Sequence, residues 1–228
     1  MRALIMAGGF GKRLMPLTRK IPKALVKVGG KSILYWQIKW LNRNGIYDFI
    51  ILGGYKASKL VGYVKSIGYS DRFEFSIEKK PLGSAGALRN AKNLLRNDGQ
   101  FLVVNGDNIT DIDISKLKLP GKAICCVSLK PYKSHAGVVQ IRNNMVTYFK
   151  EKPVIKGYWT NLGITLIKNE LLSELPKEGS LERDIFPKLI KQKRLACATY
   201  PHSYHRAVDT YKDYKEVDAY IRSGRFKV

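Results

Sequence analysis

The stretch that decides the fold is residues 4–25, LIMAGGFGKRLMPLTRKIPKAL. Its apolar beginning, Ala3 to Ala7, is typical of a buried strand, and it passes directly into Gly8, Gly9 and Gly11. Glycines let backbone N–H groups turn toward one point at little steric cost. The stretch therefore predicts a strand followed by a loop that suits a polyphosphate. The basic side chains that crowd the same region are Lys12, Arg13, Arg19, Lys20 and Lys23.

The loop differs from the two best-known phosphate-binding loops. A Walker loop has Ser or Thr after Gly-Lys, whereas Gly11-Lys12 is followed here by Arg13. A dinucleotide fingerprint has a third glycine where this chain has Leu14. The stretch resembles instead the signature of the sugar-1-phosphate nucleotidyltransferases, G-G-x-G-x-R-L-x-P-L-T followed by P-K. A glycine turn with a solvated basic face is the alternative. The residues that match the signature are Gly8, Gly9, Gly11, Arg13, Leu14, Pro16, Leu17, Thr18, Pro22 and Lys23.

The chain is strongly basic. Its 228 residues carry 41 Lys and Arg against 18 Asp and Glu, a formal charge of +23, and 45% of them are apolar. This length and composition predict one ordinary globular domain and exclude a disordered chain. A positive field attracts nucleic acid, membrane surfaces and nucleotide polyphosphates alike. The excess is dense around the opening stretch, because residues 1–47 contain ten Lys and Arg and no acidic residue.

The cysteines and the hydropathy pattern indicate the compartment in which the protein is expected. Cys125, Cys126 and Cys197 show no CxxC spacing, which favours buried thiols in a reducing compartment. The N-terminal apolar run is too short for a signal peptide, and no run of about twenty apolar residues occurs. A soluble cytoplasmic protein is expected. The three histidines have no metal-ligand spacing.

Strands and helices alternate through the first half of the chain. Helices are expected at residues 32–44, 59–67 and 84–95, and strands at 48–52, 73–77 and 101–104. This alternation predicts an α/β fold with a doubly wound, mostly parallel, Rossmann-like sheet. Ligands of such sheets bind outside the carboxyl ends of the strands, where both the glycine loop and Asp107 fall.

The second half is richer in strands. Strands are expected at residues 123–129, 137–142, 145–150 and 163–167, with a hairpin turn at Asn143-Asn144, and closing helices at 182–193 and 210–222. The pattern predicts a mixed sheet with a β-rich, sugar-binding insertion over the substrate. We expect a single domain, residues 1–228, in which 1–122 mainly bind nucleotide and 123–228 mainly bind sugar phosphate. No β-helix repeat follows.

The resemblance assigns roles to the phosphate-binding and metal-binding residues. Arg13 and Lys23 would hold the nucleotide's phosphates, helped by the loop amides up to Lys12, although any one lysine could equally be surface charge. Asp107, in NGD, and Asp209, in AVDT, would bind Mg²⁺. Asp209 could instead be the N-cap of the last helix.

A second element resembles the family's base-binding L-G-T-A-G-A-L. It is the segment SIEKKPLGSAGAL, which contains Glu78, Gly83 and, in place of Thr, Ser84. A carboxylate at Glu78 can accept from the adjacent N–H groups of a guanine edge, which favours GTP over uracil or thymine nucleotides. An ion pair of Glu78 with Lys79 or Lys80 is the alternative.

The sugar side of the site rests on three short matches. Glu151 and Lys152 belong to E-K-P, in which the family's Glu contacts sugar hydroxyls and its Lys the sugar phosphate. Asn161 and Gly163 match N-x-G-I, and Gly137 matches the glycine of G-V-V. The resemblance thus implies Arg13, Lys23, Asp107 and Lys152 as the catalytic groups.

The resemblance implies an Mg²⁺-dependent enzyme that makes an NDP-sugar and pyrophosphate from an NTP and a sugar 1-phosphate. Several phrases resemble the mannose- and heptose-1-phosphate guanylyltransferase branch. A uridylyl- or thymidylyltransferase of glucose-type sugars remains open, and so does a non-catalytic nucleotide- or RNA-binding protein. No aromatic-rich RNA-binding motif is present, so neither specific nucleic acid nor membrane is an expected partner. A homo-oligomer is compatible with the sequence.

Overall fold

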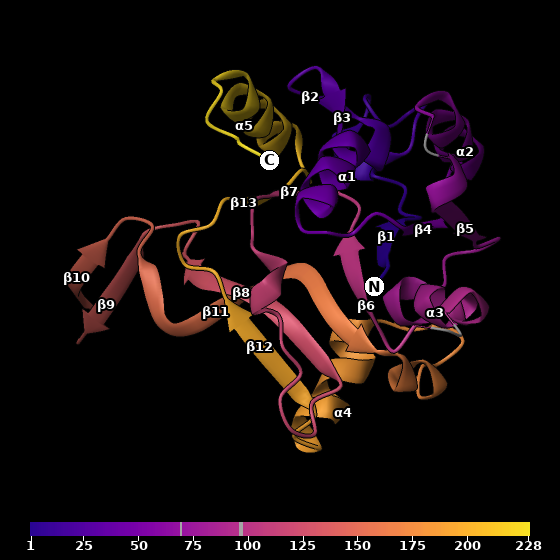
Figure 1. Cartoon of the computed structure of the whole chain (residues 1–228). Coiled ribbons are helices and arrows are strands. Elements are labelled where there is room, and N and C mark those ends of the chain that lie inside the picture. The colour runs from indigo at the N-terminus through magenta and orange to yellow at the C-terminus, as the bar shows by residue number, and fades with distance from the viewer. Residues whose placement is uncertain (69, 96–97) are drawn as a thin grey trace.

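Seven strands form the central sheet of the computed structural model, which describes residues 1–68, 70–95 and 98–228 (Figure 1). Their order is β12-β8-β11-β6-β1-β4-β5. Every strand runs in the same direction except β11, which is antiparallel to β6 and β8. The predicted mostly parallel Rossmann-like sheet is therefore confirmed. The strands are β1 (Ala3–Ala7), β4 (Phe49–Gly53), β5 (Phe73–Ile77), β6 (Gln100–Asn105), β8 (Cys125–Lys133), β11 (Val154–Lys168) and β12 (Leu195–Thr199).

Both faces of the sheet are apolar and covered. Successive side chains of a strand point to opposite faces, so Leu4 belongs to one core and its neighbours Ala3 and Ile5 to the other. Helices α1 (Ile33–Arg43) and α2 (Ala57–Ser66) pack on the face of Ile5. Helices α3 (Gly83–Asn90) and α4 (Phe186–Lys191) pack on the face of Leu4. The sheet is doubly wound, as the alternation of elements predicted.

A third apolar cluster joins the C-terminus to the opening stretch. Helix α5 (Tyr211–Arg222) contributes Val217 to a core that also holds Leu14 and Val208. The hairpin of β2 (Lys27–Val28) and β3 (Lys31–Ser32) lies beside this helix. A further short pair, β7 (Asn108–Thr110) with β13 (His205–Ala207), connects the end of β6 to the segment before α5. The C-terminal helix therefore packs against the segment that follows the glycine loop.

Several helices differ from their predicted extents. The expected helix at 84–95 ends as an α-helix at Asn90 and continues as a 3₁₀ turn, Lys92–Leu95. The expected helix at 182–193 begins as a π-turn, Leu181–Ile185, before α4. The first helix agrees closely, because Ser32 accepts from the Tyr35 N–H as its N-cap. The remaining 3₁₀ turns are Lys12–Leu14, Lys23–Leu25, Ser70–Arg72, Ile114–Lys116 and Asn169–Ser173.

Most of the strand-rich second half joins the central sheet. Strands β8 and β11 extend beyond their predicted bounds and complete the central sheet. Only β9 (Val138–Arg142) and β10 (Met145–Lys150) stand apart, as a hairpin that projects from the body (Figure 1). Its turn is the predicted Asn143-Asn144, where both residues have positive φ, as type I′ turns require. None of the helices in the described residues has the length and hydropathy to cross a membrane.

Candidate active site

The glycine loop leaves β1 at the carboxyl edge of the sheet. Gly11 has φ +60°, and a Cβ there would come within 2.9 Å of Cγ2 of Thr18. The hydroxyl of buried Thr18 donates to the Gly11 carbonyl at 2.8 Å. The signature threonine therefore fixes the loop from behind, which explains why a short polar residue stands at this position.

Two aspartates from distant parts of the chain meet beside this loop. Asp107 lies in the turn that joins β6 to β7, and Asp209 lies between β13 and α5. The pairing of β7 with β13 aligns the two segments, and the Val208 N–H donates to the Asp107 carbonyl at 2.9 Å. A separation of about 100 residues in sequence is thus closed by one short antiparallel ladder.

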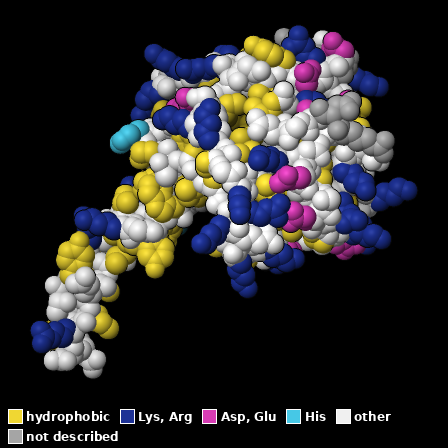
Figure 2. Space-filling view, turned by 60° about the horizontal axis from the view of Figure 1, so that its bottom comes forward, with side chains coloured by type: hydrophobic (Ala, Val, Ile, Leu, Met, Phe, Trp, Pro, Cys, Tyr) yellow, Lys and Arg dark blue, Asp and Glu magenta, His cyan; other side chains and the backbone are white. Residues whose placement is uncertain are grey.

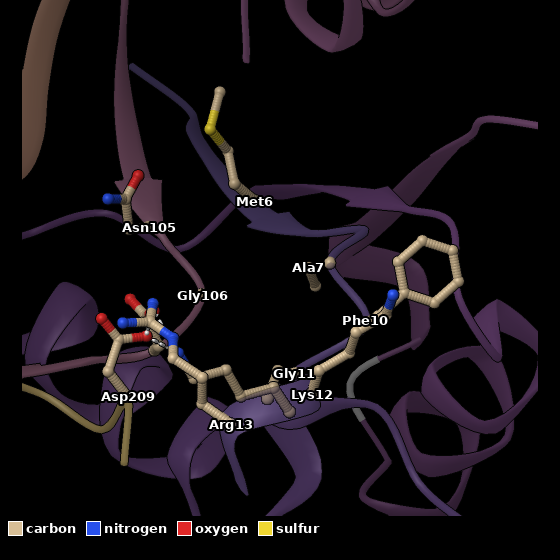
Figure 3. A pocket seen from close by; sticks show the side chains of 13 residues that line it. Met6, Ala7, Phe10, Gly11, Lys12, Arg13, Asn105, Gly106 and Asp209 are labelled. Atoms are coloured by element: carbon tan, nitrogen blue, oxygen red, sulfur yellow. Dashed lines mark hydrogen bonds and ion pairs between the residues drawn. The ribbon is translucent and has the colours of Figure 1, made fainter. Parts of the chain in front are cut away.

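Lys23 joins both aspartates. Its Nζ lies 2.5 Å from Oδ2 of Asp107 and 2.5 Å from Oδ1 of Asp209. Arg13 reaches the same carboxylate from the solvent side, with Nη2 3.1 Å from Oδ1 of Asp209. Figure 3 shows Arg13 extending toward Asp209 at one side of the cavity. The structure therefore brings together four residues that the sequence assigned separately.

The alternative role of Asp209 as a helix cap is wrong. Thr210 is the N-cap of α5, because its hydroxyl accepts from the Asp213 N–H while the Asp213 carboxylate accepts from the Thr210 N–H. Asp209 is therefore left to face Lys23 and Arg13.

These groups surround a cavity of about 360 Å³. Sequence analysis missed part of its wall. Asn105 and Gly106 end β6, and a Cβ on Gly106 would lie 2.4 Å from the Met6 carbonyl, so only glycine permits this approach of the two strand ends. The NGD pattern could have indicated this. The cavity is lined by Met6, Ala7, Gly9, Phe10, Gly11, Lys12, Arg13, Lys23, Ala24, Asn105, Gly106, Asp107 and Asp209.

A buried glutamine holds the turn that carries Asp107. The side-chain amide of Gln37, on α1, donates to the carbonyls of Asn105 at 2.7 Å and Asn108 at 3.1 Å. Asn108 in turn donates to the Leu162 carbonyl at 2.8 Å. A buried polar residue on an otherwise apolar helix face was the available signal for this supporting role.

A second cavity, of about 250 Å³, adjoins the first and shares Met6, Gly9 and Phe10 with it. Glu78 lines this second cavity. Its Oε1 atom lies so close to Gly8 that a Cβ on Gly8 would come within 2.7 Å of it. Oε2 of Glu78 accepts from the Leu82 N–H at 3.1 Å. Lys80 pairs with Glu178 and not with Glu78. Among the described residues, no ion pair joins Glu78 to either neighbouring lysine.

Gly83 and Ser84 also line the second cavity, at the start of α3. Gly83 has φ +74°, and a Cβ there would lie 2.3 Å from the Gly179 carbonyl. The Ser84 hydroxyl accepts from the Leu181 N–H at 2.8 Å and donates to Glu182 at 3.1 Å. The small residues thus allow the Gly179 segment to pack closely against the start of α3.

The predicted sugar-side residues fall in two places. Gly163 has φ +68° and lies against Asn105 of the first cavity, and its N–H is held by the Asn161 side chain at 3.0 Å. Glu151 and Lys152 lie at the base of the projecting hairpin, paired at 3.3 Å and exposed. Neither lines the cavities. Gly137 lies beside them, because a Cβ on Gly137 would come within 3.1 Å of Oε2 of Glu151.

Comparison with known proteins identifies the family. Residues 2–223 match the model of the nucleotidyl transferase family. A mannose-1-phosphate guanyltransferase from Kluyveromyces lactis is 33% identical over 210 residues, 86% of this chain and 58% of that protein. A D-glycero-α-D-manno-heptose 1-phosphate guanylyltransferase from Campylobacter jejuni is 31% identical over 201 residues, 86% of this chain and 90% of that protein. The chain thus spans little more than half the length of its fungal relative.

Solved structures agree in fold. HddC from Yersinia pseudotuberculosis, complexed with GMP-PN, superposes with a TM-score of 0.73 at 24% identity, over 96% of this chain and 99% of that one. A putative glucose-1-phosphate thymidylyltransferase from Bacillus anthracis superposes with a TM-score of 0.75 at 24% identity, over 97% and 95% of the two chains. With the glycine loop, the strand-end aspartates and the family match in agreement, this chain belongs to the nucleotidyl transferase family and resembles its mannose- and heptose-1-phosphate guanylyltransferase branch.

Proposed function

We propose that this chain transfers a nucleotidyl group from an NTP, preferentially GTP, to a mannose- or heptose-type sugar 1-phosphate and releases pyrophosphate. The observation that carries the proposal is the cluster of Lys23, Asp107, Asp209 and Arg13 at the glycine-loop cavity. It combines anion-binding and cation-binding groups in one place, as the transfer of a charged phosphoryl group between two polyanions requires.

The triphosphate is assigned to the glycine loop. The backbone N–H groups between Gly8 and Lys12 supply donors, and Arg13 supplies a planar guanidinium that can bridge two phosphate oxygens. Arg13 is largely exposed in the free protein, so it can swing from Asp209 onto a phosphate without leaving a buried charge unpaired.

The two aspartates fit Mg²⁺. Their oxygens converge on one cationic atom, Nζ of Lys23, and Mg²⁺ takes one or two carboxylates and completes its shell with water and phosphate oxygens. Asp107 and Asp209 would hold the ion. When bound, it neutralises charge that develops on the α-phosphoryl group and the departing pyrophosphate. Lys23 is then released toward the phosphates, so one lysine serves the free and the loaded site.

The reaction needs no general base from the protein. A phosphate monoester has a second pKa of about 6, so the sugar-phosphate oxygen is already ionised at neutral pH. This oxygen forms the new bond to the α-phosphorus, and the bond from the α-phosphorus to the bridging oxygen breaks with its electron pair leaving on pyrophosphate. Positioning and charge neutralisation are therefore the whole task of the side chains.

The base is assigned to the cavity of Glu78. Gly9 has open space beside it, and the Glu78 carboxylate lines this cavity together with Gly8 and Gly83. Guanine presents two adjacent N–H donors to such an acceptor, whereas uracil presents one donor between two acceptors. Support also comes from the guanylyltransferases among the relatives.

The sugar phosphate is assigned to residues of the second half, so that 1–122 mainly serve the nucleotide and 123–228 mainly serve the sugar. Gly163 and Asn161 stand beside the wall at Asn105. Lys152 has φ +44°, a left-handed backbone that costs a non-glycine residue about 1 kcal/mol and is typical of functional positions. We assign Glu151 and Lys152, with Gly137, to the outer end of the sugar site.

The location proposed is the cytoplasm. Cys125 and Cys126 are adjacent, buried and unpaired, and burial raises the pKa of both thiols, which keeps them unreactive. The expectation of a buried thiol is wrong for Cys197, which is exposed. The proposed NTP substrates are also metabolites of the cytoplasm. Neither nucleic acid nor membrane is needed by the proposed reaction.

The test is pyrophosphate release from GTP, ATP, CTP, UTP and dTTP, each with mannose-, glucose- and heptose-type sugar 1-phosphates, under Mg²⁺. Turnover that depends on both substrates, with GTP and a manno-configured sugar fastest, is expected. If turnover is fastest with UTP or dTTP and glucose 1-phosphate, the assignments of the base and the sugar are wrong, and these substrates replace them. If no pair of substrates is turned over, the proposal that this chain is an enzyme is wrong.

A substitution at Glu78 tests the assignment of the nucleotide base separately. Substituting Glu78→Gln replaces one acceptor oxygen by a donor, so kcat/KM for GTP should fall about tenfold or more, while that for the poorest NTP changes little. Steady-state kinetics with both nucleotides measure the ratio. Ser76→Ala, on the neighbouring strand β5, is the control for general disturbance of this edge. An unchanged ratio would remove Glu78 from base selection.

A further inference from the structure

Phe10 is the aromatic residue of a loop, residues 8–13, that otherwise consists of glycines and cations. Its side chain is 46% exposed. Single exposed apolar residues are ordinary on a protein surface, and Figure 2 shows that many of them gather on the projecting hairpin of β9 and β10. Phe10, in contrast, lines both cavities of the candidate active site. Its position, and not its exposure, therefore calls for an explanation.

The ring of Phe10 lies where the two cavities join. The cavity assigned to the triphosphate and the cavity assigned to the base share Met6, Gly9 and Phe10 in their walls. Gly9 has open space where a Cβ would lie, so the side chains at this junction belong to Met6 and Phe10. In every nucleotide the ribose lies between the base and the α-phosphate. A nucleotide that fills both cavities therefore places its ribose at the junction, beside the Phe10 ring.

Tyr55 holds the ring of Phe10 in place. The two ring centroids lie 5.2 Å apart, at an interplanar angle of 49°. Tyr55 follows β4, and its N–H donates to the Gly8 carbonyl at 3.1 Å. Its hydroxyl lies 3.4 Å from the carbonyl oxygens of Thr18 and Arg19. Tyr55 thus contacts the chain before and after Phe10. The ring is fixed before a ligand arrives, which lowers the entropy cost of binding.

Lys12 lies over the same ring. Its Nζ is 5.9 Å from the ring centroid, and Figure 3 shows the end of Lys12 beside Phe10, on the side of the cavity opposite Asp209. An aromatic face attracts an ammonium group, but a phosphate oxygen attracts it more strongly. A bound triphosphate would therefore draw Lys12 off the ring and leave the face of the ring to the nucleoside.

We propose that Phe10 binds the nucleoside part of the NTP, with its ring packed against the ribose and the adjoining edge of the base. The inference rests on the proposed function, because it uses the cavities assigned there to the base and the triphosphate. A ring contact of this kind does not depend on the hydrogen-bonding groups of the base. Phe10 therefore contributes affinity for every NTP, whereas Glu78 distinguishes guanine from the other bases.

The contact with the nucleoside is the same before and during the transfer, because the ribose does not change in the reaction. An interaction of equal strength in the ground state and the transition state lowers KM and leaves kcat unchanged. Loss of the ring should therefore raise the KM for the NTP and spare kcat. Loss of a residue that acts on the transferred phosphoryl group would lower kcat instead.

Calorimetric titration of the full chain with GTP, UTP and inorganic tripolyphosphate, under Mg²⁺, separates the nucleoside from the phosphates. Phe10→Ala should weaken the binding of GTP and UTP about tenfold each and change that of tripolyphosphate less than about twofold. In turnover, the KM for GTP should rise about tenfold while kcat stays within about twofold. Phe10→Tyr keeps the ring and should bind GTP as the wild type does.

Tyr47→Ala is the matched control. Tyr47 is 48% exposed, close to the 46% of Phe10, and it also has a cation over its ring, with Cζ of Arg72 5.6 Å from the centroid. It lines neither cavity of the site. Its substitution should leave the binding of GTP and the KM unchanged. Circular dichroism verifies the fold of each variant, and Phe10→Leu repeats the test if Phe10→Ala does not fold.

Four results would overturn the role of Phe10. They are wild-type affinity for GTP in Phe10→Ala, an equal loss of GTP and tripolyphosphate binding, an equal effect of Phe10→Ala and Tyr47→Ala, and a wild type that binds no NTP. The proposed reaction fails separately. If the wild type binds GTP without turnover and Phe10→Ala weakens that binding, the reaction is wrong and the role of Phe10 stands. If turnover occurs and Phe10→Ala leaves KM unchanged, the reaction stands and the role of Phe10 is wrong.

Discussion

At the scale of single residues, the site depends on where one ammonium group lies. Lys23 is mostly buried and contacts both Asp107 and Asp209, and with Arg13 on Asp209 the two carboxylates are already neutralised in the free protein. Two carboxylates without that cation would repel each other. Under the proposed function, Asp107 and Asp209 would exchange Lys23 for a metal ion, because both carboxylates already converge on one cationic atom.

The first prediction concerns Asp107. Asp107→Asn keeps the volume and removes the charge that Mg²⁺ needs, so kcat/KM for pyrophosphate release should fall by about 100-fold or more. Circular dichroism and thermal unfolding should show an intact fold. Glu174→Gln, an exposed carboxylate paired with Arg194, is the control and should retain full activity. Wild-type turnover by Asp107→Asn would remove this residue from the metal site.

At the scale of elements, the short ladder between β7 and β13 determines the geometry of the site. It contains only three residue pairs, yet it brings Asp209 beside Asp107. The capping box of α5 fixes the chain on the other side of Asp209. Weakening either element should therefore disturb activity through position, without touching a substrate.

The cap of α5 provides the second prediction. Thr210→Ala removes the hydroxyl that accepts from the Asp213 N–H, which should lower the free energy of unfolding by about 1 kcal/mol. Urea unfolding measures the change. Thr147→Ala, at an exposed position of β10, is the matched control and should change stability by less than about 0.5 kcal/mol. Equal stability of the two variants would contradict the capping role.

The third prediction concerns pH and His205, in β13. Burial, with a smaller contribution from Lys130, lowers the pKa of His205 to about 4, and its Nδ1 is buried with no hydrogen-bond partner among the described residues. The unfolded chain, with a pKa of about 6.5, binds the proton first as pH falls. Stability should therefore be complete above about pH 6.5 and fall by up to about 1.4 kcal/mol per pH unit toward pH 4.

Urea unfolding at several pH values between about 7 and 4.5 measures this slope. His205→Asn cannot take up the proton and should show a flatter profile. Asp213 and Asp218 have lowered pKa values, so their contribution is lost only below their ordinary value of 3.8, outside this window. Parallel profiles for the wild type and the variant would contradict the assignment.

At the scale of the whole molecule, net charge and the projecting hairpin of β9 and β10 are the two unusual features. The excess of positive charge is densest in residues 1–47, which build the glycine loop and the edge around it. A field of this sign raises the local concentration of two polyanionic substrates. The hairpin of β9 and β10, in contrast, exposes apolar side chains such as Ile141 and Phe149.

The fourth prediction follows from this field. The Debye length falls from about 10 Å at 0.1 M salt to about 3 Å at 1 M, so kcat/KM for the charged substrates should fall roughly tenfold over that range. Initial rates at low substrate concentration measure this quantity. Turnover at saturating substrate should change much less, since encounter is then not limiting. A salt-independent kcat/KM would show that the field is not used.

Local sequence features predicted the strand-and-helix alternation and the glycine loop, because each depends on neighbouring residues: apolar periodicity and glycines in a turn. Asp107 and Asp209 were assigned to the metal by the family resemblance, and that assignment stays a prediction. Sequence alone did not give the direction of β11, the turn fixed by Gln37, or the separation of β9 and β10 from the central sheet. The meeting of Lys23 with Asp107 and Asp209 also came only from the tertiary structure, because a three-pair ladder between residues about 100 positions apart leaves no periodic signal.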